Sequence, residues 1–78
     1  MKIEVLGSGC QRCHLLAEQT AAALKELGLA DAVEHVTDLK RIMGYGVLST
    51  PALVIDGKVK CQGRMPSAEE LRAWLAAA

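Results

Sequence analysis

The segment Gly7-Ser8-Gly9-Cys10-Gln11-Arg12-Cys13 contains two cysteines in a C-x-x-C spacing, directly after a short apolar stretch. Before it, residues 2–6 alternate apolar and charged side chains, which predicts a β-strand with two unequal faces. After it, apolar residues recur at helical spacing, which predicts a helix over residues 11–27 that ends at Gly28. The dithiol therefore stands where a strand gives way to the N-terminus of a long helix.

The two cysteines occupy a position that suits a reactive thiol. Unpaired backbone N–H groups and the positive end of the helix dipole stabilise an anion at a helix N-terminus. We therefore expect Cys10 to have a lowered pKa and to be the attacking sulfur. Cys13 follows one turn later on the same face, within reach to close a disulfide, and Arg12 adds a positive charge between them. The alternative is that both thiols are buried and inert, which would not explain why they stand as a pair at a strand-to-helix turn.

The rest of the chain predicts five further elements. Strands are expected at residues 33–36, 52–55 and 58–61. A short helix should be capped by Thr37 or Asp38 and stopped by Gly44. A last helix should begin at the capping box Ser67-Ala68-Glu69-Glu70. Asp56-Gly57 predicts a two-residue type I′ hairpin. Counting outward from that turn pairs Ile55 with Lys58 and Ala52 with Cys61.

The element order is thus β-α-β-α-β-β-α. The first two strands need a right-handed crossover and parallel pairing, whereas the hairpin is antiparallel. We predict an α/β fold in which residues 1–78 form one domain, a four-stranded mixed sheet flanked by helices.

Composition excludes several classes of function. The chain is 51% hydrophobic and 23% charged, with nine basic and nine acidic residues, which supports a packed core and argues against disorder. Zero net charge and only two aromatic residues argue against nucleic-acid binding. No stretch approaches the roughly 20 apolar residues of a membrane span, and the first residues are too short for a secretory signal. We expect a cytoplasmic monomer, whose paired cysteines serve redox chemistry or bind metal.

Thr50 and Pro51 stand immediately before the strand at 52–55. Because proline cannot donate to a sheet, Pro51 must begin that strand. With this Thr-Pro pair and the cysteine motif, the chain resembles the thioredoxin-like superfamily, and within it the very small redox-active disulfide proteins. The resemblance spans nearly the whole chain.

The resemblance implies a thiol–disulfide oxidoreductase that needs no cofactor beyond its own disulfide and no metal. Cys10 would attack a substrate disulfide and Cys13 would resolve the mixed disulfide. Pro51, in cis, would keep backbone away from the sulfurs and leave the Thr50 main chain free to pair with an extended substrate. The partners implied are a disulfide-containing protein or small molecule and an electron donor that the sequence does not name. The residues expected to bind substrate are Gln11, Arg12, Thr50 and Pro51.

This chain departs from its larger relatives at two places. Thioredoxins proper place Trp before the first cysteine and Gly-Pro between the pair, where this chain has Gly9 and Gln11-Arg12. Glutaredoxins hold glutathione with Gly-Gly and an acid after the hairpin, where this chain has residues 61–64, Cys-Gln-Gly-Arg. Residues 61–64 therefore do not match the glutathione-binding pattern, and the sequence does not tell whether glutathione binds.

Two further residues are secondary candidates. Glu4 stands six residues before Cys10, the offset at which thioredoxins bury an acid, so it is a candidate proton relay. We favour the alternative interpretation, that Glu4 is an ordinary residue of the strand. Cys61 is a candidate accessory thiol or metal ligand, although a small buried hydrophobe is commoner.

Three other functions compete with free catalysis. A soft-metal-binding or carrier module would use Cys10 and Cys13, but such domains run β-α-β-β-α-β and end in a strand. The run Cys10 to His14 matches the C-x-x-C-H haem attachment pattern, which needs export and usually a helical fold. A redox-sensing partner of another protein would keep the same fold, and no residue separates it from the enzyme.

Overall fold

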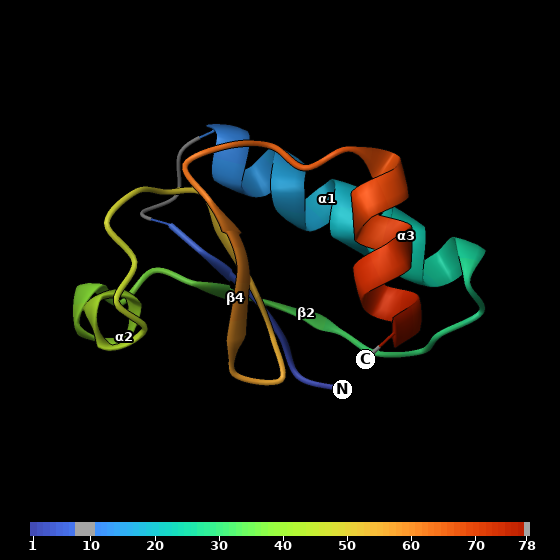
Figure 1. Ribbon diagram of the computed structural model, residues 1–78, viewed down its shortest axis with the longest axis horizontal. Helices are drawn as coiled ribbons and strands as arrows, with labels where there is room; N and C mark the ends of the chain where they lie inside the picture. Colours follow the sequence, from blue (N-terminus) through green and yellow to red (C-terminus); the bar gives the residue numbers. More distant parts are fainter. Residues whose placement is uncertain (8–10, 78) are drawn as a thin grey trace.

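A computed structural model describes residues 1–7 and 11–77 of the chain (Figure 1). Seven elements follow one another in the order β-α-β-α-β-β-α, as the sequence predicts. They are β1 (Ile3–Leu6), α1 (Gln11–Glu26), β2 (Val33–Val36), α2 (Leu39–Gly44), β3 (Ala52–Ile55), β4 (Lys58–Gln62) and α3 (Ala68–Ala77). Within the described residues, no helix is long and apolar enough to cross a membrane.

The four strands form one mixed sheet in the order β2-β1-β3-β4. β1 pairs in parallel with β2, and the long connection between them contains α1, as a parallel crossover requires. β1 also pairs antiparallel with β3, which pairs antiparallel with β4. The predicted α/β fold, a four-stranded mixed sheet flanked by helices, is confirmed. β1 is central, so the residue after it, Gly7, lies at the middle of one sheet end.

The helices divide unequally between the two faces of the sheet. α1 and α3 lie together against one face, and the shorter α2 lies on the other (Figure 1). The period-two alternation of β1 explains the division, because Ile3 and Val5 join the apolar cluster of α1 and α3 while Leu6 joins that of α2. The two clusters bury most of the apolar residues of all four strands.

Both ends of α2 follow local signals in the sequence. Asp38 caps α2, its side chain accepting from the Lys40 N–H at 3.0 Å, as predicted. Gly44, expected to stop this helix, is its last helical residue. The left-handed residue is Gly46 (φ 75°), whose N–H closes the final turn onto the Met43 carbonyl at 2.9 Å. The helix thus ends at Gly44, as predicted, and the chain turns away at Gly46.

The hairpin turns where the sequence predicts, but its register slips. Asp56 and Gly57 both have positive φ, 49° and 82°, as a type I′ turn requires. The pair Ile55–Lys58 is confirmed, whereas the predicted pairing of Ala52 with Cys61 is wrong. An irregularity between Leu53 and Val54 shifts the ladder by one residue, so that Leu53 faces Cys61 and Ala52 faces Gln62. A β-bulge of this kind places an extra residue in one strand.

The last helix opens with the predicted capping box. The Glu70 N–H donates to Ser67 Oγ at 3.1 Å, and the Ser67 N–H donates back to Glu70 Oε1 at 2.9 Å. Both bonds use backbone donors that a helix start leaves unsatisfied. Leu71 and Leu75 then bury against the sheet on one helix face.

Candidate active site

Cys13 lies in the first turn of α1, fully buried against the end of β1. A side chain on Gly7 would place its Cβ 2.0 Å from Cys13 Sγ, so the sulfur occupies the space that only glycine leaves. The Gly7 N–H donates to the Val36 carbonyl at 2.9 Å, which extends the β1–β2 pairing by one residue and fixes this approach. Ser8, Gly9 and Cys10 lie outside the described residues, and the role of Cys10 stays a prediction.

Thr50 and Pro51 lie near the same end of β1. Leu6 pairs with Ala52, so the start of β3 lies beside the end of β1. A Cβ on Gly7 would lie 3.8 Å from Thr50 Cβ, and the Thr50–Pro51 peptide bond is cis. Thr50 is exposed and Pro51 is buried. The structure therefore brings together two positions 37 residues apart that the sequence singled out separately.

The end of β4 holds the loop that carries Thr50. The Gly63 N–H donates to the Pro51 carbonyl at 2.9 Å, and the Leu48 N–H donates to Gln62 Oε1 at 3.0 Å. Gly63 has φ 72°, and a Cβ there would lie 2.8 Å from Ser49 Cβ. The sequence analysis gave neither Gly63 nor Gln62 a role at the site. The one-residue shift at the bulge is the feature that brings Gln62 opposite Ala52.

Gln11 and Arg12 are exposed beside the buried Cys13. They line a surface hollow along the first turns of α1, together with His14, Leu15 and Glu18. His14 also packs edge-on against His35 of β2, with ring centroids 4.9 Å apart. Of the four residues predicted to contact substrate, Gln11 and Arg12 are thus accessible at this end of α1.

Glu4 is fully buried, and its described partners come from α2 and its cap. It accepts a hydrogen bond from the Tyr45 hydroxyl and forms an ion pair with Arg41 Nη2 at 2.8 Å. Arg41 also reaches Glu34 on β2 at 2.9 Å, and these two carboxylates raise the pKa of Arg41, Glu34 having the larger effect. The hydrogen bond to Glu4 raises the pKa of Tyr45. This network ties α2 to the sheet, and it supports the structural reading of Glu4; the proton relay stays a prediction.

Cys61 is part of the core. Its side chain lies in the cluster formed with α1 and α3, opposite Leu53. Burial raises the pKa of the Cys61 thiol, with Arg64 opposing the shift. A protonated, buried thiol is a poor nucleophile, which favours the reading of Cys61 as a small buried hydrophobe.

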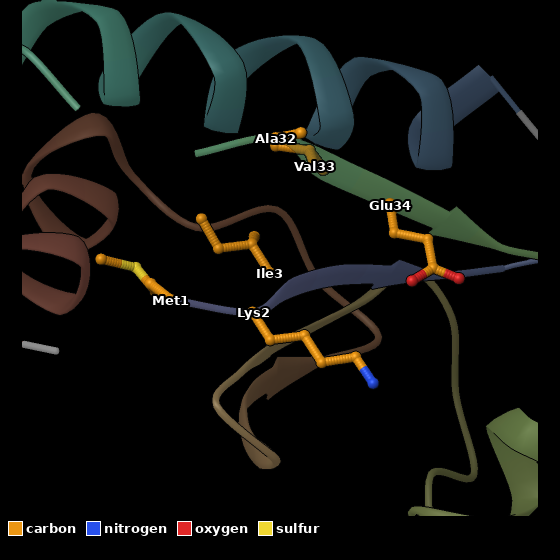
Figure 2. A pocket seen from close by; sticks show the side chains of 6 residues that line it. All are labelled: Met1, Lys2, Ile3, Ala32, Val33 and Glu34. Carbon is orange, nitrogen blue, oxygen red and sulfur yellow. The ribbon is translucent and has the colours of Figure 1, made fainter. Parts of the chain in front are cut away.

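A second hollow lies at the opposite end of β1 (Figure 2). It is lined by Met1, Lys2, Ile3, Ala32, Val33 and Glu34. Figure 2 shows Lys2 and Ile3 pointing in opposite directions, as successive residues of an extended chain do. Its lining carries no thiol, and among the described residues no three His, Cys, Asp or Glu side chains gather in a group that would hold a metal ion. Cys13 lies at the other end of β1, against Gly7.

Comparison with known proteins agrees with this geometry. The family described as thioredoxin domain matches residues 1–76. A thioredoxin of Methanothermobacter thermautotrophicus is 36% identical over 75 residues, which cover 96% of this chain and 97% of that protein. A thioredoxin of Methanocaldococcus jannaschii is 33% identical over 73 residues, covering 94% of this chain and 84% of that protein. Similarity across most of both lengths, over a fold of the expected topology, shows that the chain belongs to the thioredoxin family as a thioredoxin-type thiol–disulfide oxidoreductase.

Proposed function

We propose that the chain reduces disulfides with Cys10 as the nucleophile and Cys13 as the resolving thiol. The observation that carries this proposal is the packing of Cys13 Sγ, in the first turn of α1, against Gly7, with Thr50 close to the same glycine. In the sequence, Cys10 precedes Cys13 by three residues in the C-x-x-C spacing. A sulfur held at a helix N-terminus beside an exposed main chain is suited to exchange with an incoming disulfide.

The exchange proceeds in two balanced steps. The Cys10 thiolate attacks one sulfur of the substrate disulfide, a new S–S bond forms, the old one breaks, and one substrate thiolate leaves. Cys13 then loses its proton and attacks the Cys10 sulfur, which releases the second substrate thiolate. Two electrons pass to the substrate, and the chain is left with a Cys10–Cys13 disulfide. A separate thiol or enzymatic electron donor must reduce it again.

The surface around the dithiol binds the substrate. The exposed Thr50 offers its main chain to an extended segment, and Gln11 and Arg12 border the same place from α1. A dithiol that acts as a reductant needs a compartment that keeps supplying electrons, so we assign its activity to the cytoplasm.

Trapping tests the two sulfur roles separately. Cys13→Ser should accumulate mixed disulfides with substrate through Cys10, because nothing resolves them, whereas Cys10→Ser should abolish exchange and trap nothing. Cys61→Ser is the matched control and should behave as wild type, since Cys61 is buried in the core. Mass spectrometry identifies the trapped linkage. Trapping by Cys10→Ser instead of Cys13→Ser would overturn the assignment.

A further inference from the structure

Gln62 ends β4 and reaches from there to the loop between α2 and β3. It pairs with Ala52, the first residue of β3, and its side-chain oxygen Oε1 accepts from the Leu48 N–H at 3.0 Å. Leu48 belongs to neither helix nor strand. A backbone N–H outside regular structure depends on a side chain, a turn or water for its hydrogen bond. Gln62 thus gives the loop a partner that the sheet ladder does not provide.

The bulge in β4 turns Gln62 toward this loop. The register passes over Lys60 and puts Ala52 opposite Gln62, where a regular ladder would put Cys61. Because successive side chains of a strand point to opposite faces, this shift exchanges the faces of Cys61 and Gln62. Cys61 joins the core under α1 and α3, whereas Ala52 belongs to the α2 cluster together with Val47, the residue before the bonded N–H. Gln62 is therefore on the face from which the loop arrives.

Gly63 adds two contacts with the same loop. Its N–H donates to the Pro51 carbonyl at 2.9 Å, and a Cβ on it would lie 2.8 Å from Ser49 Cβ. Together with Gln62, the end of β4 contacts the loop on both sides of Thr50, which stays exposed. The Gly63 hydrogen bond joins two backbone groups, whereas the Gln62 hydrogen bond depends on a side chain. Substitution can therefore remove the Gln62 contact alone.

The segment that carries these contacts is itself fixed to α3. Arg64 follows Gly63 and donates to both oxygens of the Glu70 carboxylate, at 3.0 and 2.9 Å. A bidentate pair of this kind adds a defined geometry to the ionic attraction. Glu70 also accepts from the Ser67 N–H in the capping box of α3. Residues 62–64 thus connect the loop to a helix end, so the loop is held against a fixed support.

We infer that Gln62 is a positioning residue of this enzyme, whose side-chain oxygen holds the main chain before Thr50 in the form that pairs with a peptide disulfide. The inference rests on the proposed function and deepens it. A loop that is ordered before binding lowers the entropy cost of ordering it on the substrate. Without the Gln62 acceptor, the Leu48 N–H bonds to water, the loop samples more conformations, and the peptide must order it.

The test compares a peptide disulfide with a small disulfide that has no peptide backbone. The first is a disulfide-linked dimer of one linear peptide, and the second is bis(hydroxyethyl) disulfide. Protein reduced beforehand is mixed with an excess of either one, and second-order rate constants are measured by acid quench and mass spectrometry. Gln62→Met keeps the length of the side chain and removes the acceptor. It should lower the rate constant for the peptide about three- to tenfold, the net contribution of one hydrogen bond, and leave that for the small disulfide unchanged.

Three further variants separate the hydrogen bond from the side chain that makes it. Gln62→Glu keeps an acceptor oxygen and should keep both wild-type rate constants. Gln62→Asn is one carbon shorter, withdraws the amide from the Leu48 N–H, and should repeat the loss for the peptide. Gln19→Met is the matched control, because it makes the same exchange at an exposed position of α1, and it should change neither rate constant. Thermal unfolding checks each fold, and Gln62→Asn decides if Gln62→Met does not fold.

Amide hydrogen exchange followed by NMR tests the same contact without a substrate. The Leu48 N–H should exchange faster in Gln62→Met and Gln62→Asn than in wild type, and at the wild-type rate in Gln62→Glu. An unchanged rate of Leu48 exchange in Gln62→Met and Gln62→Asn would mean that the Gln62 oxygen does not hold this main chain, and would overturn the inference.

The kinetic outcomes separate this inference from the proposed function. If wild type reduces neither disulfide, the proposed function fails and the inference fails with it. If wild type reduces both, the proposed function stands, and the inference is overturned by any of three results. These are an equal loss for both disulfides in Gln62→Met, no loss for the peptide, or a loss for the peptide in Gln62→Glu as large as that in Gln62→Met.

Discussion

The two faces of the central strand bury very different groups. On the face toward α1 and α3 the core is apolar, and Cys13 is buried where that face meets Gly7. On the face toward α2, β1 buries the carboxylate of Glu4, which is bound to Arg41 and Tyr45. The thiol needs space and the acid needs charge partners. Substitutions on the two faces should therefore have different effects. A larger side chain beside Cys13 should crowd the sulfur and reduce activity, whereas removal of a partner of Glu4 should reduce stability alone.

Crowding the thiol face should have the largest effect. Gly7→Ala places a Cβ 2.0 Å from Cys13 Sγ, so the sulfur or the strand end must move. We expect exchange to fall about a hundredfold, because a displacement of about 1 Å is costly at a reacting centre, with about 1–3 kcal/mol of destabilisation from overpacking. Stopped-flow reduction of a peptide disulfide and thermal unfolding measure the two effects.

Gly28→Ala is the matched control for Gly7→Ala. Gly28 follows α1 with φ 72°, but a Cβ there meets nothing within 4 Å. This variant should lose about 1 kcal/mol through the left-handed backbone and keep the wild-type exchange rate. Equal losses of exchange in both variants would show that Gly7 acts through general stability and makes no particular space for the sulfur.

Removing the charge partner on the α2 face should reduce stability without changing exchange. Arg41→Met leaves the Glu4 carboxylate buried with Tyr45 as its described donor. We expect a loss of about 1–3 kcal/mol, less than for a fully buried pair because Arg41 is 43% exposed. The double variant Glu4→Leu with Arg41→Met should regain part of this loss in urea unfolding.

A substitution at Glu4 alone decides whether this residue is structural or a proton relay. Glu4→Gln keeps the shape of the side chain and removes its charge, and the structural reading predicts an unchanged pH–rate profile for disulfide reduction. A profile that changes on the alkaline or acid limb would make Glu4 the proton relay after all.

The smallest effect is expected at the start of α3, away from both faces. Hydrogen bonds from Arg64 and from the Ser67 N–H lower the pKa of Glu70 from 4.5 to about 2. Because the folded-state pKa is depressed, this contribution to stability is complete above pH 4.5 and is lost as the pH falls toward 2. Melting temperatures measured from pH 6 to pH 2 should fall less steeply in Glu70→Gln than in wild type.

The cap itself can be tested at neutral pH. Ser67→Ala removes the acceptor of the Glu70 N–H and should cost about 1 kcal/mol, with Ser49→Ala as a hydroxyl-deletion control that touches no helix cap. A loss that matches the control would mean that the capping box contributes nothing measurable.

Features set by neighbouring residues were predictable from the sequence, and features set across the sheet were not. The Asp38 cap, the Asp56-Gly57 turn and the capping box of Ser67 are all built from residues within four positions of each other. The bulge between β3 and β4 made the predicted pairing of Ala52 with Cys61 wrong. A bulge depends on how the two strands pair, and no residue near the turn predicts it.

The site shows the same division. The cysteine spacing and Thr50-Pro51 are visible in the sequence, and the fold brings Cys13 and Thr50 close to one glycine, Gly7. The space at Gly7 was missed because a glycine after a strand first suggests a turn. The partners of Glu4 lie 37 and 41 residues away, beyond the reach of any local pattern.

A redox titration tests the central claim most directly. The protein is equilibrated in graded dithiol and disulfide buffers, quenched with acid, unfolded, alkylated and weighed. Of its three cysteines, Cys10 and Cys13 should be protected together in a single two-electron step at one defined potential, while Cys61 is alkylated throughout. Alkylation of all three cysteines at every potential, or a disulfide that includes Cys61, would contradict the account.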